Sequence, residues 1–383
     1  MEIEIGKLIK KAKLIRCGDG EYPVLSMTMH DGLMFQNDRF KKQIASVDQS
    51  QYQVVQRHQL VESFPIDEGV LAVQELTDAG IVSPAYKIWD VDMEKVVPKY
   101  LEFALRAPKS IEYYKFKLRG TTARRRSIPD AEFCAMRIKC PSLDEQKIIV
   151  DTIEKTKRVI DSRNLELDTL DDLIKARFVE MFGNPLDGTA KYPIHQVGEI
   201  ANSVDPQPSH RTPPIDEDGI PYVSIKDCDY KTGKIDFEGA RKVSRKVLEE
   251  HLNRYTLHDG DFVIGKIGTI GNPVFVPARD DYTLSANVIL VQPNSKLVSP
   301  YFLKYSFESD FVERQFAEAK NSTSQAAFGI QKVRTVEVMN PDLSVQMGFE
   351  DFVKQVDKSK LLVQKSLDET QVLFNSLMQK YFG

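Results

Sequence analysis

Lysines, acids and cysteines that could carry chemistry occur in this chain, but their spacing fits no catalytic or metal-binding pattern. Gly265-Lys266-Ile267-Gly268-Thr269 lacks the GxxxxGK[ST] spacing that cradles nucleotide phosphates, so ATP hydrolysis is not predicted. Asp280 and Asp281 follow Arg279 in a turn-like stretch and are interpreted as turn residues rather than nuclease carboxylates. The cysteines form no CxxC pair and are expected to be buried free thiols; they are Cys17, Cys134, Cys140 and Cys228.

Methyl transfer by the chain itself is also not predicted. Asn272-Pro273-Val274-Phe275 is similar to the Asn-Pro-Pro-Phe/Tyr signature that holds a flipped adenine in amino-methyltransferases, but the second proline is missing. No glycine-rich loop after a predicted strand is available for S-adenosylmethionine. The sequence therefore predicts no catalytic residues, no metal and no cofactor.

Two polar segments could instead contact nucleic acid, because base edges need hydrogen-bonding side chains and phosphates need Lys, Arg, Ser or Thr. Each lies just before the last predicted strand of its half of the chain. The candidates in the first are Thr121, Thr122, Arg124, Arg125 and Arg126, and those in the second are Ser322, Thr323, Ser324 and Gln325. Further candidates are His210, Arg211, Lys226 and Lys266. The alternative is that these are solvated surface residues without a role.

The bulk composition predicts a multidomain protein outside the membrane. The chain has 383 residues, of which 42% are hydrophobic and 28% charged, and no apolar run approaches the roughly 20 residues that cross a bilayer. The first residues do not form a secretory signal, so a cytoplasmic location is expected. The net charge of -4 is unusual for a DNA-binding protein. Any DNA surface must therefore be local, or shared with partners.

The strongest signal is an internal repeat at a spacing of about 200 residues. Residues 141–183 align without a gap on residues 341–383, and both copies run from Pro-x-Leu-x-x-Gln to Phe-Gly. The preceding segments correspond more weakly. There, Pro98-Lys99-Tyr100-Leu101 is similar to Pro300-Tyr301-Phe302-Leu303, Pro23-Val24-Leu25-Ser26 to Pro221-Tyr222-Val223-Ser224, Thr121 to Thr323, and Gly6 to Gly198.

Both repeated segments have the three-and-four spacing of a coiled-coil seam. The first seam contains Ile153, Thr156, Ile160, Arg163, Leu167, Leu170, Ile174, Arg177 and Met181; the second contains Val353, Val356, Lys360, Val363, Leu367, Thr370, Phe374, Leu377 and Tyr381. The polar positions favour two unlike helices of about 35 residues that pair antiparallel within one chain. A dimerisation device or an ordinary helical hairpin is the alternative for the pattern taken alone.

The two remaining stretches are predicted to be similar α+β domains. Residues 222–225, 261–264 and 287–291 are predicted strands, Pro98 to Lys117 and Pro300 to Lys320 predicted helices, and Pro206 to Pro214 a predicted exposed loop. The predicted organisation is 1–140 and 184–340 as globular halves, with 141–183 and 341–383 as helices.

Taken together, this organisation resembles the specificity (S) subunit of type I restriction-modification systems. The resemblance rests on the two alternating halves and helices, the Pro-x-Leu-x-x-Gln and Phe-Gly motifs, and Gly260-Asp261 followed by Gly268-Thr269. The first half lacks a clear counterpart to these glycine motifs. The fold that the resemblance implies is α+β, with two pseudo-symmetric target-recognition domains separated by two long conserved helices that pair as an antiparallel coiled coil.

The same resemblance implies a non-catalytic targeting subunit. Each half would read one half of a split, asymmetric site on double-stranded DNA, and the helices would set the spacing and hold two methyltransferase (M) subunits. Restriction (R) subunits would join through the M subunits. Two alternatives stay open at this stage: a protein-interaction adaptor that binds no DNA, and a self-contained modification enzyme with a degenerate active site.

Overall fold

A computed structural model describes residues 2–29, 31–39, 49–118, 126–209, 211–230, 232–266, 271–321 and 329–383. The chain divides into two compact units. The first comprises Met1–Asn164 and Gln364–Gly383, and the second comprises Leu165–Val363. Each unit therefore holds one globular half together with part of each of two long helices.

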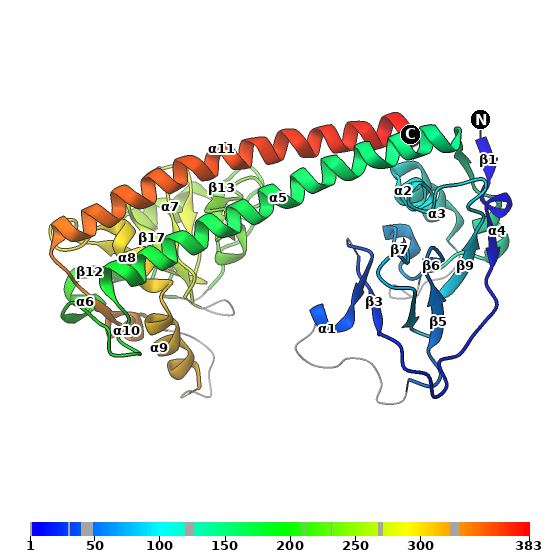
Figure 1. The fold of residues 1–383 in the computed structure, drawn as a ribbon. Helices are drawn as coiled ribbons and strands as arrows, with labels where there is room; N and C mark the ends of the chain where they lie inside the picture. The colour runs from blue at the N-terminus through cyan, green and yellow to red at the C-terminus, as the bar shows by residue number, and fades with distance from the viewer. Residues whose placement is uncertain are drawn as a thin grey trace. The chain divides into compact units, whose positions relative to one another are not determined.

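The globular part of the first unit combines short strands with helices that follow them. Its strands are β1 Glu2–Glu4, β2 Ile9–Lys11, β3 Leu25–Met27, β4 Leu33–Phe35, β5 Gln53–Gln56, β6 Leu60–Glu62, β7 Leu71–Val73, β8 Ala79–Val82, β9 Lys87–Val91 and β10 Arg137–Lys139. Its helices are η1 Ile5–Lys7, α1 Gln36–Arg39, η2 Ile66–Glu68, α2 Pro98–Arg106, α3 Pro108–Lys117 and α4 Asp130–Ala135. In Figure 1, α2 and α3 lie beside the end of the sheet formed by β6, β7 and β9.

The globular part of the second unit has the same succession of elements with additions in its middle. Its strands are β11 Ile194–Gln196, β12 Ala201–Val204, β13 Ile220–Val223, β14 Cys228–Asp229, β15 Lys234–Ile235, β16 Lys242–Val243, β17 Phe262–Gly265, β18 Val274–Phe275, β19 Thr283–Leu284, β20 Val288–Pro293 and β21 Glu337–Met339. Its helices are α6 Val197–Ile200, η3 Ile225–Asp227, α7 Arg245–Leu252, α8 Pro300–Phe307, α9 Asp310–Asn321 and α10 Ile330–Arg334.

The sheets of the two halves have the same topology. A four-stranded antiparallel sheet has the order β2-β9-β6-β7 in the first half and β12-β20-β17-β18 in the second. The first and last strands of each half also pair antiparallel, as β1 with β10 and β11 with β21. A parallel contact recurs too, as Val24 with Ile81 and Tyr222 with Thr283. The halves are therefore two versions of one fold, as the repeat predicts.

Gly6 and Gly198 occupy equivalent positions because the same close approach requires each of them. A Cβ atom on Gly6 would lie 3.1 Å from Cys134 Cβ, and one on Gly198 would lie 3.2 Å from Arg334 Cβ. Cys134 is near the end of α4 and Arg334 is the last residue of α10. The predicted correspondence of these two glycines is thus confirmed by packing.

The turn before β6 supplies the counterpart to Gly260-Asp261 that is not evident in the sequence of the first half. His58 adopts a positive φ of 69°, and Gly260 a φ of 92°, in the turn that precedes the equivalent strand β17. Gln59 Oε1 accepts from the backbone N–H of Gln56 at 2.7 Å, as Asp261 Oδ2 does from His258 at 2.9 Å.

A second contact of these turns keeps its geometry but exchanges its chemical groups. The Gln59 amide donates to Asp90 in the first half, at 2.6 Å. In the second half the Gln292 amide donates to Asp261, at 2.7 Å. The amide and the carboxylate have therefore changed places between two equivalent strand positions, and this exchange hides the relationship from a sequence comparison.

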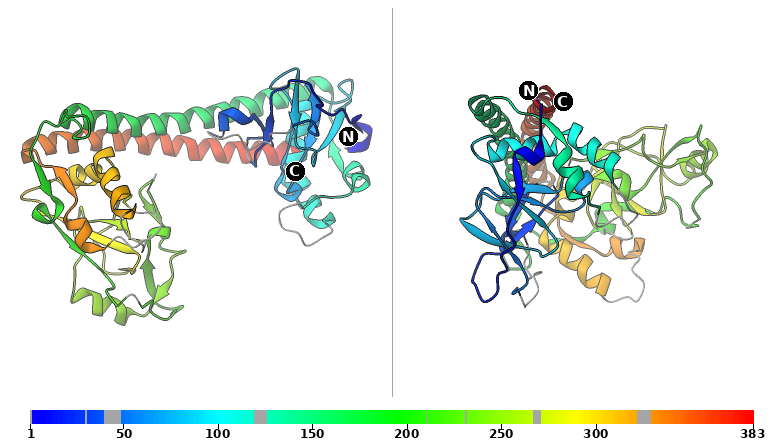
Figure 2. Two further views of the ribbon diagram at one scale, coloured as in Figure 1. Left: turned by 90° about the horizontal axis from the view of Figure 1, so that it is seen from below. Right: turned by 90° about the vertical axis from the view of Figure 1, so that its right-hand side faces the viewer.

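The two long helices are α5, Leu143–Phe182, and α11, Leu343–Phe382, and each has 40 residues. In the first unit Ile149 and Ile153 of α5 share a core with Phe382 of α11. In the second unit Phe178 of α5 contacts Phe349 of α11, with ring centroids 5.4 Å apart. The helices thus pair antiparallel, and Figures 1 and 2 show them side by side within each unit. Every predicted seam residue is buried or half-buried, so the predicted seam is confirmed.

The motif glutamines at the start of each helix explain why Pro-x-Leu-x-x-Gln is repeated. Gln146 and Gln346 are both fully buried. Gln146 Oε1 accepts from Val97 N–H at 2.8 Å, directly before α2, and its amide donates to Pro141 O at 2.9 Å. Gln346 makes the same two bonds, at 2.7 Å each, with Ser299 N–H and Pro341 O. Each glutamine therefore joins the start of a long helix to the first helix of the adjoining half.

The closing phenylalanines make the complementary contact. Phe382, at the end of α11, packs on Tyr100 of α2 in the first unit, with ring centroids 5.2 Å apart. Phe182, at the end of α5, packs on Phe302 of α8 in the second unit, at 4.8 Å. Each globular half is thus held by the start of one long helix and the end of the other.

Several sequence expectations need correction. The helix predicted from Pro98 to Lys117 is two helices, because Pro108 cannot continue α2 and begins α3 instead. The helix predicted from Pro300 to Lys320 is likewise broken, with Ser309 O accepting the first backbone hydrogen bonds of α9.

One strand end and two of the thiols also differ from the sequence prediction. The strand predicted over residues 222–225 ends at Val223, because Ser224 caps η3. Only Cys17 and Cys228 are buried, whereas Cys134 and Cys140 are partly exposed beside the ends of short elements.

Candidate nucleic-acid interface

The predicted basic segment of the first half joins α3 to α4, and its described flanks are held together. Thr121, Thr122, Arg124 and Arg125 lie outside the described residues. On either side, Lys117 at the end of α3 forms an ion pair with Glu132 of α4 at 2.7 Å. Tyr113 Oη also donates to Glu132 O at 2.8 Å. These bonds bring the two ends of the segment close together.

Arg126 is the one described member of this group, and it is fixed against the acidic turn η2. Its Nε lies 3.1 Å from Asp67 Oδ1, and its Nη2 lies 2.5 Å from Glu68 Oε1. Its carbonyl accepts from Ile66 N–H at 3.0 Å. The side chain keeps a third of its surface exposed. Arg126 therefore anchors the end of the segment and neutralises part of the acidic turn.

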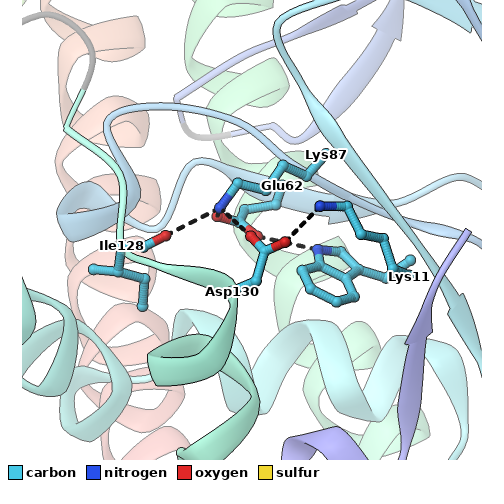
Figure 3. Close-up of polar contacts among 6 residues, drawn as sticks. Lys11, Glu62, Lys87, Ile128 and Asp130 are labelled. Atoms are coloured by element: carbon cyan, nitrogen blue, oxygen red, sulfur yellow. Dashed lines mark hydrogen bonds and ion pairs between the residues drawn. The ribbon is translucent and has the colours of Figure 1, made fainter.

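A largely buried ion pair lies next to Ile128 of the same segment (Figure 3). The Glu62 carboxylate accepts from Lys87 Nζ and from Trp89 Nε1, each at 3.0 Å. Burial raises the pKa of the Glu62 carboxyl, although Lys87 and Trp89 oppose that shift. Burial alone would lower the pKa of Lys87, but Glu62 and Asp130 outweigh it and raise the pKa. The equivalent positions of the second half are Ile264, Ile289 and Val291, so the same place in the sheet is apolar there.

The same ammonium group fixes the start of α4. Lys87 Nζ lies 2.9 Å from Asp130 Oδ1 and donates to Ile128 O at 3.0 Å, while Lys11 Nζ lies 2.5 Å from Asp130 Oδ2. Desolvation acts against the ionised Asp130, but its hydrogen bonds from the two lysines prevail and lower its pKa. Residues 126–130 are thereby tied to strands β6, β9 and β2. The residues that follow the predicted DNA segment are thus fixed to the sheet by hydrogen bonds and ion pairs.

The residues on either side of the polar segment in the second half are also held by hydrogen bonds. Ser322, Thr323, Ser324 and Gln325 lie outside the described residues. Lys332 of α10 donates to Ala319 O of α9 at 3.2 Å, across the ends of the segment. Gln315 of α9 makes two bonds with the backbone of Glu337 in β21, at 2.8 and 2.9 Å. Both predicted segments therefore leave and re-enter the fold between two helices that are bonded together.

The other candidates lie in different surroundings, and His210 is outside the described residues. Arg211 is exposed in the loop after β12, and Lys226 is exposed in η3. Lys266 is only 6% exposed, and its Nζ lies 2.7 Å from Asp205 Oδ2. The structure thus presents two of these side chains to solvent and places the third in a largely buried ion pair.

Sequence reasoning missed the residues that mount these segments. Glu62 and Lys87 are 25 residues apart, and Asp205 and Lys266 are 61 residues apart. A buried charge on a strand was the one signal available, since Glu62 interrupts the apolar residues of β6 and the strands around it.

Among the described residues, no group of three or more His, Cys, Asp or Glu side chains could hold a metal ion. No described helix is long and apolar enough to cross a membrane. Asn272-Pro273-Val274-Phe275 leads into β18, where Val274 is buried and the Phe275 ring packs on Tyr301 at 5.0 Å.

Comparison with known proteins finds a similar domain in the second half of the chain. Residues 192–370 match the type I restriction modification DNA specificity domain. The chain is 19% identical over 264 residues to the Type I restriction enzyme EcoBI specificity subunit of Escherichia coli, and the match covers 62% of this chain and 55% of that protein. The matched region thus spans little more than half the length of this curated relative.

Two solved structures share the fold. One is the type I restriction-modification S subunit of M. genitalium, with 13% identity and a TM-score of 0.56, covering 100% of this chain and 96% of that one. The other comes from work on complex assembly and conformational transition of the type I restriction-modification system, with 14% identity, a TM-score of 0.55, and coverage of 100% and 97%. These two likenesses concern the fold. Residues 192–370 are therefore similar to a type I restriction modification DNA specificity domain, and the fold of the chain is similar to that of solved type I restriction-modification S subunits.

Proposed function

We propose that this chain is the non-catalytic, sequence-reading subunit of a type I restriction-modification complex. Each globular half reads one part of a split, asymmetric site on double-stranded DNA, with residues 1–140 and 184–340 as the two target-recognition domains. The observation that carries the proposal is the repetition of one fold with one mounted polar segment in each copy. The copies differ in side chains, so two equivalent surfaces read two different sequences.

The site residues are those of the mounted segments and the exposed cations beside them. Thr121, Thr122, Arg124 and Arg125 serve the first half, and Ser322, Thr323, Ser324 and Gln325 serve the second. Arg126, Arg211, Lys226 and Lys266 hold or extend these surfaces. Arginine and lysine supply phosphate contacts, whereas the hydroxyl and amide groups suit base edges.

The long helices, residues 141–183 and 341–383, set the spacing of the half-sites and bind two M subunits. Leu173 and Leu373 are equivalent in the repeat and are 47% and 51% exposed on the helices. Leu165 and Leu361 add apolar side chains that are 66% and 71% exposed. Exposed apolar side chains of this size favour protein partners. Two equivalent positions suit two copies of one partner, and R subunits join through these M subunits.

The net charge of the chain is consistent with a shared DNA surface. A chain of net charge -4 neutralises few phosphates by itself. M subunits that close around the duplex would supply the remaining phosphate contacts. The logarithm of the binding constant should therefore fall more steeply with salt for the complex than for the chain alone, and equal slopes would contradict this division of labour.

The test is a selection from a random duplex library by the chain in complex with its methyltransferase subunits. The expected product is two short fixed sequences separated by a constant number of free base pairs. Arg125→Ala should weaken binding and lower the salt slope by about one, with the Arg314→Ala variant of an exposed arginine in α9 as control. Failure of the complex to enrich any sequence would overturn the proposal.

A further inference from the structure

The loop between β12 and β13 in the second half is held by partly buried hydrogen bonds at both of its ends. At its start, Asp205 Oδ2 accepts from Lys266 Nζ at 2.7 Å and Oδ1 accepts from Gln207 N–H at 3.2 Å. At its far end, Arg241 Nη2 donates to Pro213 O at 2.6 Å. The loop is therefore anchored on both sides by side chains that come from other elements.

Between these anchors, Gln207 links the loop to the protein interior. Its amide nitrogen donates to Ser209 Oγ at 2.8 Å and to Arg211 O at 3.3 Å. Its Oε1 lies 2.6 Å from Nε2 of His251, which belongs to α7 and is only 4% exposed. One side chain thus fixes the loop tip on one side and contacts a buried histidine on the other.

The donor and acceptor roles in this series of hydrogen bonds follow from the chemistry of its groups. The carbonyl of Arg211 can only accept, so the amide nitrogen of Gln207 must face it and Oε1 must face His251. His251 Nε2 therefore carries the proton, and Nδ1 accepts from the Thr283 hydroxyl at 2.7 Å. Thr283 in turn accepts from Tyr255 Oη at 3.0 Å.

The last group in this series of hydrogen bonds, Tyr255 Oη, also has a partner for its oxygen. Tyr255 Oη accepts from Leu284 N–H of β19 at 3.2 Å. Every member therefore has its partner when His251 is neutral and its proton is on Nε2. Burial lowers the pKa of His251; Arg254 acts in the same direction and Glu250 opposes it. The neutral form that fits these hydrogen bonds is thus the form that burial favours.

The loop tip itself faces solvent beyond the bonds that Gln207 makes with Ser209 Oγ and Arg211 O. Ser209, Arg211 and Thr212 are exposed, and the guanidinium of Arg211 has no protein partner in the described part of the chain. A loop fixed by hydrogen bonds that presents the exposed Arg211 guanidinium suits a phosphate or base contact. A contact made by such a preorganised loop costs less ordering entropy.

We propose that His251 and Gln207 are positioning residues for a DNA contact made by Arg211, and that Lys266 acts as the anchor of the same loop through Asp205. The inference rests on the proposed function and deepens it. It assigns part of the sequence preference of the second half to hydrogen-bonded residues that lie outside the DNA surface. The first half contains no aligned counterpart of this histidine in its described residues, so the device serves one half-site.

The experiment compares four variants of the complete complex on the duplex that it selects. They are Arg211→Ala, Gln207→Leu, the double variant, and Gln196→Leu, which changes an exposed glutamine in β11 of the same half. The first two should each weaken binding about tenfold and lower the salt slope by about one. The double variant should be no weaker than either single variant, because both remove one contact. The control should bind like the unchanged chain.

A scan of base substitutions adds a readout that a general loss of structure would not give. Preferences at one half-site should relax in Gln207→Leu, while those at the other half-site stay unchanged. Gln207→Glu, which keeps the acceptor for His251 and removes both donors to the tip, should behave like Gln207→Leu and guards against a folding defect. Unaltered affinity and preference in both Gln207 variants, or additive losses in the double variant, would overturn this inference alone. A complex that selects no sequence would overturn the proposed function with it.

Discussion

Replacing Gln146 by leucine should destabilise the first unit by about 3 kcal/mol. The substitution leaves Val97 N–H and Pro141 O without the partners that now lie 2.8 and 2.9 Å away, inside a fully buried site. An unsatisfied buried polar group costs about 1–3 kcal/mol, and leucine recovers part of that through its own burial. With a urea m-value of about 2 kcal/mol/M, the unfolding midpoint should fall by about 1.5 M.

The chain offers a selective reporter for this experiment. Trp89 is its single tryptophan, is 2% exposed, and belongs to the core of the first unit. Its fluorescence during urea titration therefore follows the unit that contains Gln146. Gln371→Leu, at an exposed position of α11 in the same unit, is the matched control and should shift the midpoint by less than about 0.3 M. Equal midpoints for Gln146→Leu and the control would refute the role assigned to the motif glutamine.

Three more perturbations test separate parts of the structure. The Lys360–Asp171 ion pair joins the long helices at 2.6 Å, and reversing either charge should lower the free energy of unfolding by about 1 kcal/mol. Reversing both charges should restore it in a double-mutant cycle. Additive losses would argue against the antiparallel register. Glu62→Leu should cost about 2 kcal/mol by Trp89 fluorescence, because it removes a buried carboxylate from the half-buried Lys87 ammonium and from Trp89 Nε1. A neutral effect would contradict the role of that ion pair. The folded-state pKa of His251 lies below its ordinary value of 6.5, so the unfolded chain binds the proton first as the pH falls. The free energy of unfolding should therefore decrease below about pH 6.5. Calorimetry should show a smaller decrease in His251→Gln.

The long helices were the part of the fold that the sequence determined best. Periodicity over residues 141–183 and 341–383 is a local property, and each seam residue contributes the same kind of burial. The buried glutamines were visible as a repeated motif, but their role was not. A polar residue fixed inside an apolar pattern marks a buried bond, yet its partners at Val97 and Ser299 are almost 50 residues away.

The globular halves were harder because their similarity is carried by geometry. A left-handed turn is usually indicated by glycine, so Gly260 was noticed and His58 was not. The pairs Gln59–Asp90 and Asp261–Gln292 occupy equivalent positions with their chemistry exchanged. No residue-by-residue comparison detects such a swap.

The candidate site shows the same division between local and distant information. Polar composition indicates the two predicted DNA segments and the exposed loop at residues 206–214. The structure confirms that this loop contains no helix or strand among its described residues. Its anchors could not be predicted, because Gln207 and His251 are 44 residues apart and Asp205 and Lys266 are 61 apart. Such bonds depend on sheet topology, which brings their elements together only in the folded chain.

The most direct test of DNA reading by two different halves is a map of methylated adenines in the genome of cells that carry this gene with its methyltransferase, compared with cells that lack it. The account predicts that a split motif, with two fixed parts and a constant gap, loses its methylation when the gene is removed. It also predicts that exchanging residues 184–340 for those of a related chain changes one part of the motif and leaves the other intact. An unchanged methylation map, or a motif that changes as a whole, would contradict the account.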